Sequence, residues 1–368
     1  MVKKTESRFV RSDGLPFIVA GPCSAESLSQ MIQSTQPLEG MPVLSALRAG
    51  VWKPRTRPGG FEGIGRAALP WLKEAGRMLN LPVMTEVAKP EHVEACLEAG
   101  LDMLWIGART TVNPFYVQEL AEAVRGADVS ILVKNPIHSE IGLWVGALER
   151  FERVGIHSLA AIHRGYFSLS SAPYRNEAGW DQAIALKEQM PELPILCDPS
   201  HIAGQRELVP ELAEIALELG LDGLMVEVHS DPPNALSDAN QQMDPASFKE
   251  MIKGLRMHRQ LRSEEETPSF IQQQREAIDL LDSELLKILG KRMEHVTQIG
   301  REKEHSNLAL FQWKRWMEIL QNRRNEAENI GLKPDEVEEL FRVIHKHALH
   351  RQVEEVHRKP APQKDSLY

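Results

Sequence analysis

The sequence predicts a (β/α)8 barrel followed by a small all-α domain of three helices. Eight short apolar runs, rich in β-branched residues, alternate with longer segments of helical period between about residue 17 and residue 229. Eight such units in roughly 250 residues fit a closed barrel better than an open doubly wound sheet. Beyond residue 270 no strand-like run occurs, and apolar residues recur at helical spacing.

Composition and charge exclude several functional classes. The chain has 368 residues, 42% of them apolar and 26% charged, as expected for a globular protein. A formal net charge of −9 argues against general affinity for nucleic acid or acidic membranes. The first residues are polar and lack the apolar core of a signal peptide, no apolar run approaches the ~18 residues of a membrane span, and the three cysteines form no CxxC pair. We therefore expect a cytoplasmic protein without nucleic-acid or membrane partners.

The apolar runs are predicted to be the strands of the barrel. They cover residues 17–20, 42–48, 81–87, 103–108, 130–136, 159–165, 194–201 and 223–229. Segments of helical period separate them, for example 69–79, 90–100 and 208–220. One more helix, from Pro245 to about Met257, follows the eighth run and completes a barrel domain that we place at residues 1–258.

The composition changes after the barrel domain. Residues 259–268 are charged and end in Thr-Pro, which is typical of a linker. A helical domain is expected at residues 269–357, and residues 358–368 form a polar, Pro-rich tail that we expect to be disordered.

The helical domain is predicted to contain one unusually long helix. This helix, about Ser269 to Glu304, would extend roughly 50 Å, more than a small domain can cover. We therefore expect a partner subunit to bury it, which makes the protein a homo-oligomer, at least a dimer through the helical domain. A second helix is predicted from about Leu310 to Asn329, and a third starts at Pro334, a favoured first helical position.

Polar residues follow the C-terminal ends of the apolar runs and predict an active site there. Barrel enzymes build their sites at this rim from several strands, and solvated loop starts would not place charges after so many consecutive runs. The residues at these positions are Cys23, Arg48, Lys53, Arg55, Glu86, Arg109, Lys134, Arg164, His201 and Glu227.

Four of the rim residues suit a metal ion. Cys23, His201 and Glu227 come from three strand ends, and Asp238 follows in the loop after Glu227. A thiolate, an imidazole and two carboxylates suit a divalent transition ion, although each residue alone is more often structural. Cys197 is the competing thiol, and it could equally face the barrel wall.

The cations of the rim indicate a substrate with several negative charges. Because the whole chain is acidic, a cluster of Lys and Arg at strand ends favours phosphate and carboxylate ligands, most plausibly phosphorylated small molecules. The cluster comprises Arg48, Lys53, Arg55, Arg109, Lys134 and Arg164.

Several segments together resemble the type I, β-subgroup 3-deoxy-D-arabino-heptulosonate 7-phosphate (DAHP) synthases. The resemblance covers the whole barrel in the family's order. The segments are GPCSAES (21–27), LRAGVWKPRT (47–56), IGART (106–110), VKNP (133–136), HRG (163–165), CDPSH (197–201) and VEVHSDPPNALSD (226–238). Relatives that act on arabinose 5-phosphate or N-acetylmannosamine share this barrel, but the KPRT segment is similar to that of the erythrose 4-phosphate enzymes.

The resemblance implies roles for the rim residues. It implies one divalent ion per barrel, with manganese as first choice and iron, cobalt, zinc or cadmium as alternatives, held by Cys23, His201, Glu227 and Asp238. It implies that phosphoenolpyruvate is held by Arg48, Lys53, Arg109, Lys134 and Arg164. Arg55 and Thr56 would face erythrose 4-phosphate, and Lys53 and Lys134 are expected to contribute to catalysis. Glu86 is our candidate for positioning the water that adds to C2.

The C-terminal segment resembles the all-helical chorismate mutases from Gln273 to Gln352. The similar stretches are QREAIDLLDSELLKILGKR, GREK and LFRVIHKHALHRQ. The resemblance implies that Arg275, Arg292 and Arg315 bind the two carboxylates of chorismate, and that Lys303 and Gln352 face its ether oxygen, with Arg292, Lys303 and Gln352 catalytic. Rearrangement to prephenate needs a compact bound conformer and positive charge at the ether oxygen rather than a general base. Since Arg275, Arg292 and Lys303 spread over 28 residues of the first helix and cannot all reach one small ligand, a partner subunit is expected to supply part of the set.

This segment departs from its relatives at three positions. Gln312 and Trp316 stand where several relatives carry acids near the substrate hydroxyl, and Ala348 stands where a hydroxyl residue often sits. We expect these departures to affect the efficiency of the mutase more than its identity, because the residues implied for the carboxylate and ether contacts are intact. The alternative is a helical domain that binds ligand and dimerises without useful catalysis.

The combination of the two domains predicts regulation. Only about sixteen residues precede the first strand, so we expect the helical domain to sense product, with chorismate or prephenate inhibiting the barrel. The alternative for the barrel itself is a metal-dependent aldolase that acts on a different sugar phosphate.

Overall fold

The chain forms two compact units. The structure, a computed structural model, describes residues 8–54, 59–169, 172–256 and 267–357, and the chain divides into unit 1 (residues 1–260) and unit 2 (residues 261–368). Most of the expected linker and the whole expected tail lie outside the described residues. Each unit is therefore described separately.

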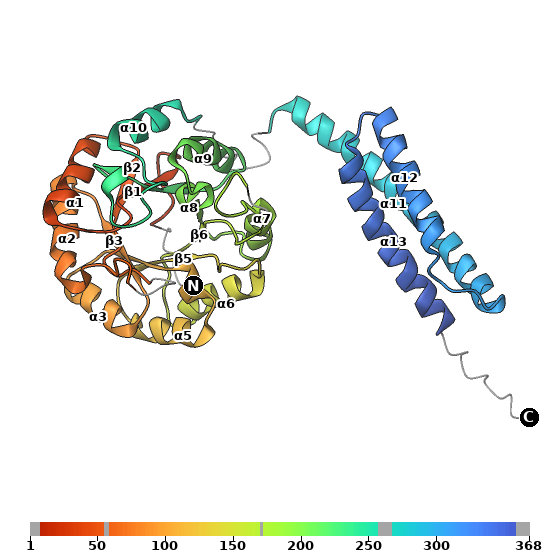
Figure 1. Cartoon of the computed structure of the whole chain (residues 1–368), viewed down its shortest axis with the longest axis horizontal. Coiled ribbons are helices and arrows are strands. Elements are labelled where there is room, and N and C mark those ends of the chain that lie inside the picture. The colour runs from red at the N-terminus through yellow and green to blue at the C-terminus, as the bar shows by residue number, and fades with distance from the viewer. Residues whose placement is uncertain (1–7, 55–58, 170–171, 257–266, 358–368) are drawn as a thin grey trace, which may run out of the picture. The chain divides into compact units, whose positions relative to one another are not determined.

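Unit 1 is a closed barrel of eight parallel strands in sequential order, with β8 pairing to β1 (Figure 1). The strands are almost entirely buried, as expected for a parallel sheet covered by helices. They are β1 (Phe17–Gly21), β2 (Leu44–Arg48), β3 (Val83–Val87), β4 (Met103–Ile106), β5 (Ser130–Lys134), β6 (Leu159–His163), β7 (Ile195–Cys197) and β8 (Gly223–Glu227). The eight predicted strands and the fold class are confirmed.

Helices surround the barrel (Figure 1). Several of them start with proline in the first turn, where the missing amide hydrogen costs nothing, and Asn113 and Asp244 cap two of them with side-chain oxygens. The helices are α1 (Leu28–Thr35), α2 (Leu69–Leu79), α3 (Pro90–Glu98), α4 (Ala108–Thr111), α5 (Pro114–Ala123), α6 (Ile141–Arg153), α7 (Trp180–Gln189), α8 (Pro199–Ala203), α9 (Val209–Glu218) and α10 (Pro245–Gly254).

The core of unit 1 has two layers because side chains alternate along each strand. Val19, Met84 and Trp105 belong to a smaller cluster that fills the barrel interior. Phe9, from the segment before β1, is fully buried in the same cluster. Ile18 and the other alternate residues pack against the surrounding helices in a larger cluster.

Closure of the barrel brings the two ends of the domain together. Gly21, at the end of β1, lies opposite Glu227 at the end of β8, and the amide of Val228 donates to the carbonyl of Gly21. Gly21 has a φ of 143°, and a Cβ at this position would lie 2.2 Å from the carbonyl oxygen of Arg48. Only glycine allows the ends of β1 and β2 to approach this closely.

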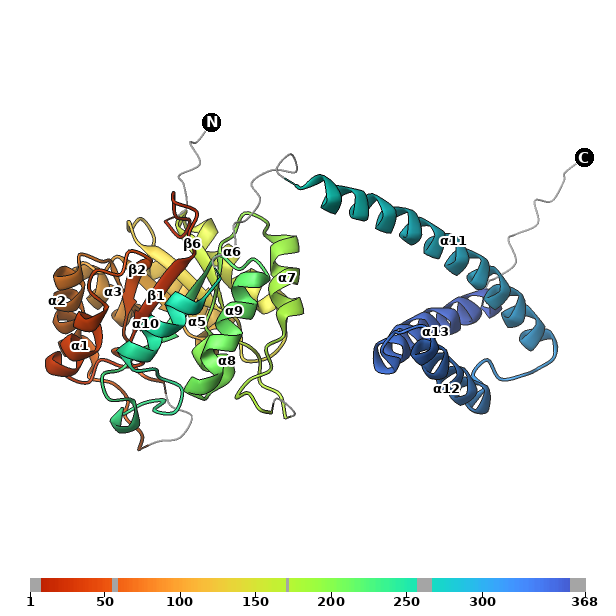
Figure 2. The ribbon, with the colours of Figure 1, turned by 90° about the horizontal axis from the view of Figure 1, so that it is seen from above.

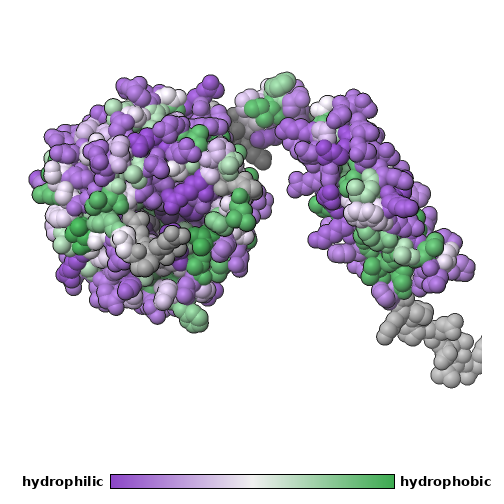
Figure 3. Space-filling view, viewed as in Figure 1, coloured by the Kyte–Doolittle hydropathy of each residue, from purple (hydrophilic) through white to green (hydrophobic). Residues whose placement is uncertain are grey.

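The described part of unit 2 consists of three helices, α11 (Ser269–His305), α12 (Trp313–Asn329) and α13 (Pro334–Val356). Residues 269–288 of α11 are all exposed, and Figure 2 shows this half extending beyond α12 and α13. Apolar side chains lie open on this unit, as the green areas of Figure 3 show. No described helix of the chain combines the length and apolar character needed to cross a membrane.

Candidate active sites

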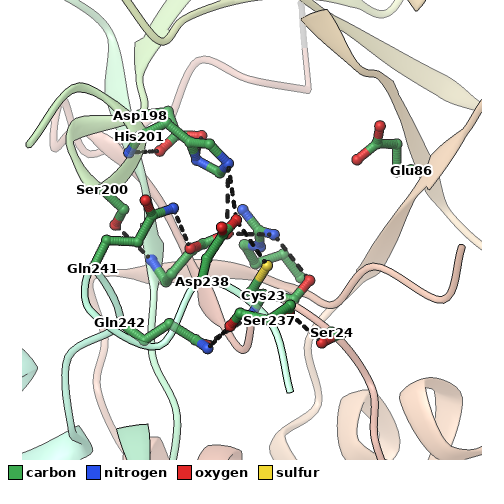
Figure 4. Close-up of polar contacts among 12 residues, drawn as sticks. Cys23, Ser24, Glu86, Asp198, Ser200, His201, Ser237, Asp238, Gln241 and Gln242 are labelled. Carbon is green, nitrogen blue, oxygen red and sulfur yellow. Dashed lines mark hydrogen bonds and ion pairs between the residues drawn. The ribbon is translucent and has the colours of Figure 1, made fainter. Parts of the chain in front are cut away.

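Three of the four predicted metal ligands form one cluster at the C-terminal rim of the barrel. The ligand atoms of Cys23, Glu227 and Asp238 all lie within 4.8 Å of one another. The fourth, His201, points its Nε2 at this cluster, 3.9 Å from Glu227 Oε1 and 3.9 Å from Asp238 Oδ2 (Figure 4). Closure of β8 against β1 and the left-handed backbone at Asp238, with φ of 45°, create this proximity.

The separations fit a bound cation. Ligand atoms about 2.0–2.3 Å from one ion in a tetrahedron lie roughly 3.3–3.8 Å apart. The Sγ of Cys23 is 3.5 Å from Asp238 Oδ2. Burial, reinforced by the charge of Glu227, raises the pKa of the Cys23 thiol to about 12. The thiol therefore keeps its proton until a cation displaces it, as expected of a metal ligand.

Asp198 connects the cluster to the cations. Its Oδ2 accepts a hydrogen bond from Lys134 Nζ at 2.6 Å and lies 2.8 Å from His201 Nδ1. Its Oδ1 accepts from the backbone amide of His201 and so caps helix α8. Because Nδ1 faces Asp198, the Nε2 of His201 is left to face Cys23 and the two carboxylates.

Two glutamines, Gln241 and Gln242, support the cluster through hydrogen bonds (Figure 4). Gln241 Nε2 donates to Glu227 Oε2 at 2.7 Å. Gln242 accepts from the backbone amide of Cys23 at 2.8 Å and donates to the carbonyl of Ser237 at 2.8 Å. These amides fix the segments before and after Asp238 without adding charge.

Arg48 presents unused donors to the barrel mouth. Its Nη2 lies 3.1 Å from Glu227 Oε1, and its guanidinium lies over the Trp105 ring at 4.8 Å. The Nε and Nη1 of Arg48 are buried and have no hydrogen-bond partner among the described residues. Since leaving buried donors unpaired costs free energy, an anionic ligand in the mouth would stabilise them.

Arg164 is held in place at the end of β6. Its guanidinium donates to the carbonyl of Gly165 and to Asn176 Oδ1 at 3.1 Å. Burial, partly opposed by Asp198, lowers the pKa of Arg164 to about 10, so it stays protonated at neutral pH. Arg109, from α4, is exposed and close enough to contribute to this lowering of the pKa.

Lys53 is half-buried at the mouth of the barrel, and the position of its side chain depends on the neighbouring Gly50. A Cβ on Gly50 would lie 2.6 Å from Lys53 Nζ, so glycine leaves the space in which this amine folds back. Arg55 and Thr56, predicted to face the second substrate, lie outside the described residues.

Glu86 lies apart from Cys23, His201 and Asp238 in Figure 4, across the mouth of the barrel. These three residues and Glu227 are called the metal-type cluster below. Its Oε2 accepts a hydrogen bond from Trp105 Nε1 at 3.3 Å. A Cβ on Gly107 would lie 2.0 Å from Glu86 Oε1, so the glycine before Ala108 makes the room that this carboxylate occupies.

The helical unit at least partly buries Arg292, Lys303 and Gln352 of its predicted residues. Arg292 and Gln352 each have a buried polar atom without a hydrogen-bond partner among the described residues. Lys303, on the same helix as Arg292, donates to the carbonyl of Leu310 at 2.6 Å. By contrast, Arg275 is exposed on the uncovered half of α11, and Arg315 is 64% exposed and paired with Glu318.

Residues 2–261 match the family described as DAHP synthetase I. The chain belongs to this family. Residues 274–353 match the chorismate mutase type II family, and the chain is thus a bifunctional shikimate-pathway enzyme that joins a DAHP synthase to a chorismate mutase.

Individual relatives agree with the family. A phospho-2-dehydro-3-deoxyheptonate aldolase of Thermotoga maritima is 32% identical over 239 residues, which cover 65% of this chain and 68% of the relative. A 2-dehydro-3-deoxyphosphooctonate aldolase of Rhodopseudomonas palustris is 26% identical over 261 residues, covering 65% of this chain and 86% of the relative.

Solved structures give the same result. The crystal structure of the Thermotoga maritima DAHP synthase superposes with a TM-score of 0.59 at 30% identity, covering 66% of this chain and 68% of that one. A truncated form of the same synthase superposes with a TM-score of 0.56 at 28% identity, covering 66% and 85%.

Sequence reasoning missed several residues that shape the barrel site of this bifunctional enzyme. Asp198 was detectable, because an aspartate three positions before His201 can cap the helix that carries it. Gln241 and Gln242 carry no charge signal, and their contacts exist only in the folded chain. The competing thiol, Cys197, is fully buried in the larger core cluster between the strands and the helices, and it is not part of the metal-type cluster.

Proposed function

We propose that the barrel condenses phosphoenolpyruvate with erythrose 4-phosphate in the presence of one divalent ion, manganese by preference. The observation that carries the proposal is the convergence of Cys23, Glu227 and Asp238 within 4.8 Å, with His201 facing them. An ion bound there would act as a Lewis acid on the aldehyde oxygen of the sugar phosphate.

The cations of the mouth then have a separate task. Arg48, with two buried unpaired donors, and the held guanidinium of Arg164 suit a phosphate and a carboxylate on one small molecule. Lys53, Lys134 and Arg109 add charge around the same position, and Arg55 and Thr56 are proposed to bind erythrose 4-phosphate.

Glu86 is proposed to position the water that adds to C2 of phosphoenolpyruvate. Its hydrogen bond from Trp105 and the space left by Gly107 support a fixed orientation across the mouth from the metal-type cluster. Replacement of Glu86 by Gln should lower kcat while phosphoenolpyruvate still binds. Unchanged turnover would remove this role.

Consumption of phosphoenolpyruvate in the presence of erythrose 4-phosphate tests the barrel reaction. The second candidate is condensation with another sugar phosphate, which the similarity to a 2-dehydro-3-deoxyphosphooctonate aldolase favours. Arabinose 5-phosphate in the same assay separates the two, because the proposed enzyme should consume phosphoenolpyruvate only with the four-carbon sugar phosphate.

For the helical unit we propose rearrangement of chorismate to prephenate in a site shared between two subunits. Arg292, Lys303 and Gln352 would come from one chain and Arg275 from its partner, because Arg275 lies about 25 Å along the axis of α11 from Arg292. Arg315 would contribute after leaving Glu318. A spectrophotometric chorismate assay separates this function from a module that only binds and dimerises.

Product sensing is the third part of the proposal. Prephenate or chorismate bound to the helical unit is proposed to inhibit DAHP synthesis, a regulation that joining the two domains in one chain supports. Barrel kinetics measured with saturating prephenate test it, and unchanged kinetics would refute it.

A further inference from the structure

His345 carries an unpaired polar atom in the same part of the helical unit as the proposed mutase residues. Among the described residues of that unit, Arg292 Nη1, His345 Nε2 and Gln352 Oε1 are buried side-chain atoms without a hydrogen-bond partner. Buried polar atoms are normally paired, so three such atoms in a small unit point to a ligand that supplies the partners. Arg292 and Gln352 already have proposed roles, whereas His345 has none.

The position of His345 places it in line with Gln352. His345, Ala348 and Gln352 follow the spacing i, i+3, i+7, which puts them on one face of α13. Ala348 and Gln352 are only 2% and 7% exposed, so this face is turned toward the other helices.

Aromatic contacts fix the orientation of the His345 ring. It stacks on Trp316 of α12 with ring centroids 4.0 Å apart and an interplanar angle of 10°. Phe311 contacts it at 6.0 Å in a tilted arrangement. Trp316 is only 7% exposed, so the stacked pair is part of the core of the unit. The imidazole is therefore positioned before any ligand arrives.

The surroundings of the ring keep it uncharged. Burial lowers the pKa of His345, and the charges of Arg292 and Lys303 on α11 lower it further. Among the described residues, no acid contributes to this shift in pKa. A neutral imidazole binds a carboxylate less well than Arg or Lys does. Its Nε2 can donate a hydrogen bond to a hydroxyl group in one tautomer and accept one from it in the other.

We propose that His345 is a binding residue of the mutase site, and that its Nε2 hydrogen-bonds the ring hydroxyl of the cyclic dicarboxylate. The inference rests on the proposed rearrangement of chorismate. Chorismate has two carboxylates, an ether oxygen and one ring hydroxyl, and the hydroxyl is the polar group for which the residues proposed above provide no partner.

The test compares two ligands on variants of the full-length chain. The variants are His345→Leu, which removes the nitrogen, and His345→Gln, whose amide can reach the position of Nε2. The ligands are chorismate and an analogue that lacks the ring hydroxyl, and kcat and KM are measured for both. His347→Leu serves as the matched control, because His347 is exposed and lies about 200° around α13 from His345.

We expect His345→Leu to raise KM for chorismate about 3- to 10-fold, the effect of losing one neutral hydrogen bond. It should leave KM for the analogue unchanged, and His345→Gln should restore most of the affinity for chorismate. Equal losses with both ligands, or no loss with either, would overturn the proposal.

Failure of the proposed function gives a different result. If the unsubstituted chain does not rearrange chorismate, the mutase function fails, and calorimetric binding of chorismate and the analogue then decides the role of His345. A preference for the hydroxylated ligand that His345→Leu abolishes would support the contact. Equal binding of the two ligands to the unsubstituted chain would overturn it.

Discussion

At the scale of single residues, Asp198 links the proposed metal ligands to the cations of the barrel site. Its carboxylate contacts both Lys134 and His201, although Lys134 is 64 positions away in sequence. It therefore sets the orientation of one proposed metal ligand and of one proposed phosphoenolpyruvate ligand together.

We predict that Asp198→Asn weakens metal binding. An amide keeps the size of the side chain but loses the charge that faces His201 Nδ1, and changes of this kind cost about 10- to 100-fold in metal affinity. Competition with a chelator measures the affinity directly. Asp128→Asn is the matched control, because the Asp128 side chain is 91% exposed and paired only with Arg8 in the described structure. Equal affinity of the two variants would contradict the prediction.

His163 gives the barrel a pH dependence of stability. Its ring is fully buried, and its Nε2 lies 2.6 Å from the carbonyl of Ala178. Burial lowers the pKa of His163 to about 4, against about 6.5 for an unfolded histidine. Below pH 6.5, His163 binds a proton in the unfolded chain but stays neutral in the folded chain. The free energy of unfolding therefore falls as the pH falls from 6.5 to about 4.

We predict that this one residue removes roughly 3 kcal/mol of unfolding free energy by pH 4. The urea midpoint of the barrel transition at pH 7 and pH 5 measures the effect in the native chain and in His163→Gln. The variant should lose less stability between these two pH values. His157→Gln, at an exposed position, should keep the native dependence. An identical slope in all three proteins would refute the assignment.

At the scale of elements, hydrophobic periodicity located the strands well, and it failed where a short helix interrupts a strand end. The run expected at 194–201 contains only the three-residue β7, because Pro199 starts helix α8. His201 therefore reaches the site from a helix. Periodicity marks which residue follows a strand, but it does not show which side chain from another strand will face it, so the pairing of Asp198 with Lys134 was not predictable.

Helix α11 leaves an apolar face uncovered in its first half. Its first half carries exposed apolar residues at alternating spacings of three and four, as in a two-helix seam. These residues include Ile278, Leu281, Leu285 and Ile288, each more than half exposed.

We predict that the chain forms an oligomer through this seam, and that the double substitution Leu281→Lys and Leu285→Lys dissociates it. Placing charges in an apolar seam removes burial and adds repulsion between the copies. Sedimentation velocity measures the change in mass. Chorismate turnover should fall with it, because Arg275 would no longer reach a neighbouring site. Ser283→Lys, also exposed on α11, should change neither quantity, and an unchanged mass for the double variant would count against the seam.

At the scale of the whole molecule, the two units have separate cores and separate candidate sites. Within the described residues, the metal-type cluster lies in the barrel, and the helical unit offers cations and a neutral imidazole instead. The fold class of each unit followed from sequence pattern, because periodicity is a local property. The need for a partner subunit at the helical site was also an expectation from the sequence, because Arg275 and Arg292 lie far apart on one helix. The role of His345 was not, because its contact with Trp316 exists only in the folded chain.

We predict that a chelator separates the two activities. Removal of the divalent ion should abolish DAHP formation, and added Mn²⁺ should restore it, whereas chorismate rearrangement in the same sample should stay constant. The rearrangement requires only conformational restriction and positive charge. Loss of both activities, or of neither, would contradict this division.

The seam between β1 and β8 also has a consequence for the order of biosynthesis. Cys23 and Asp238 are 215 positions apart, and their contact depends on the pairing of Gly21 with Glu227. A ribosome must therefore deliver β8 and the loop after it before the four proposed ligands can meet. Loading of an ion at the proposed site would therefore wait for the last step of barrel closure, and the helical unit is synthesised after the residues that close the barrel.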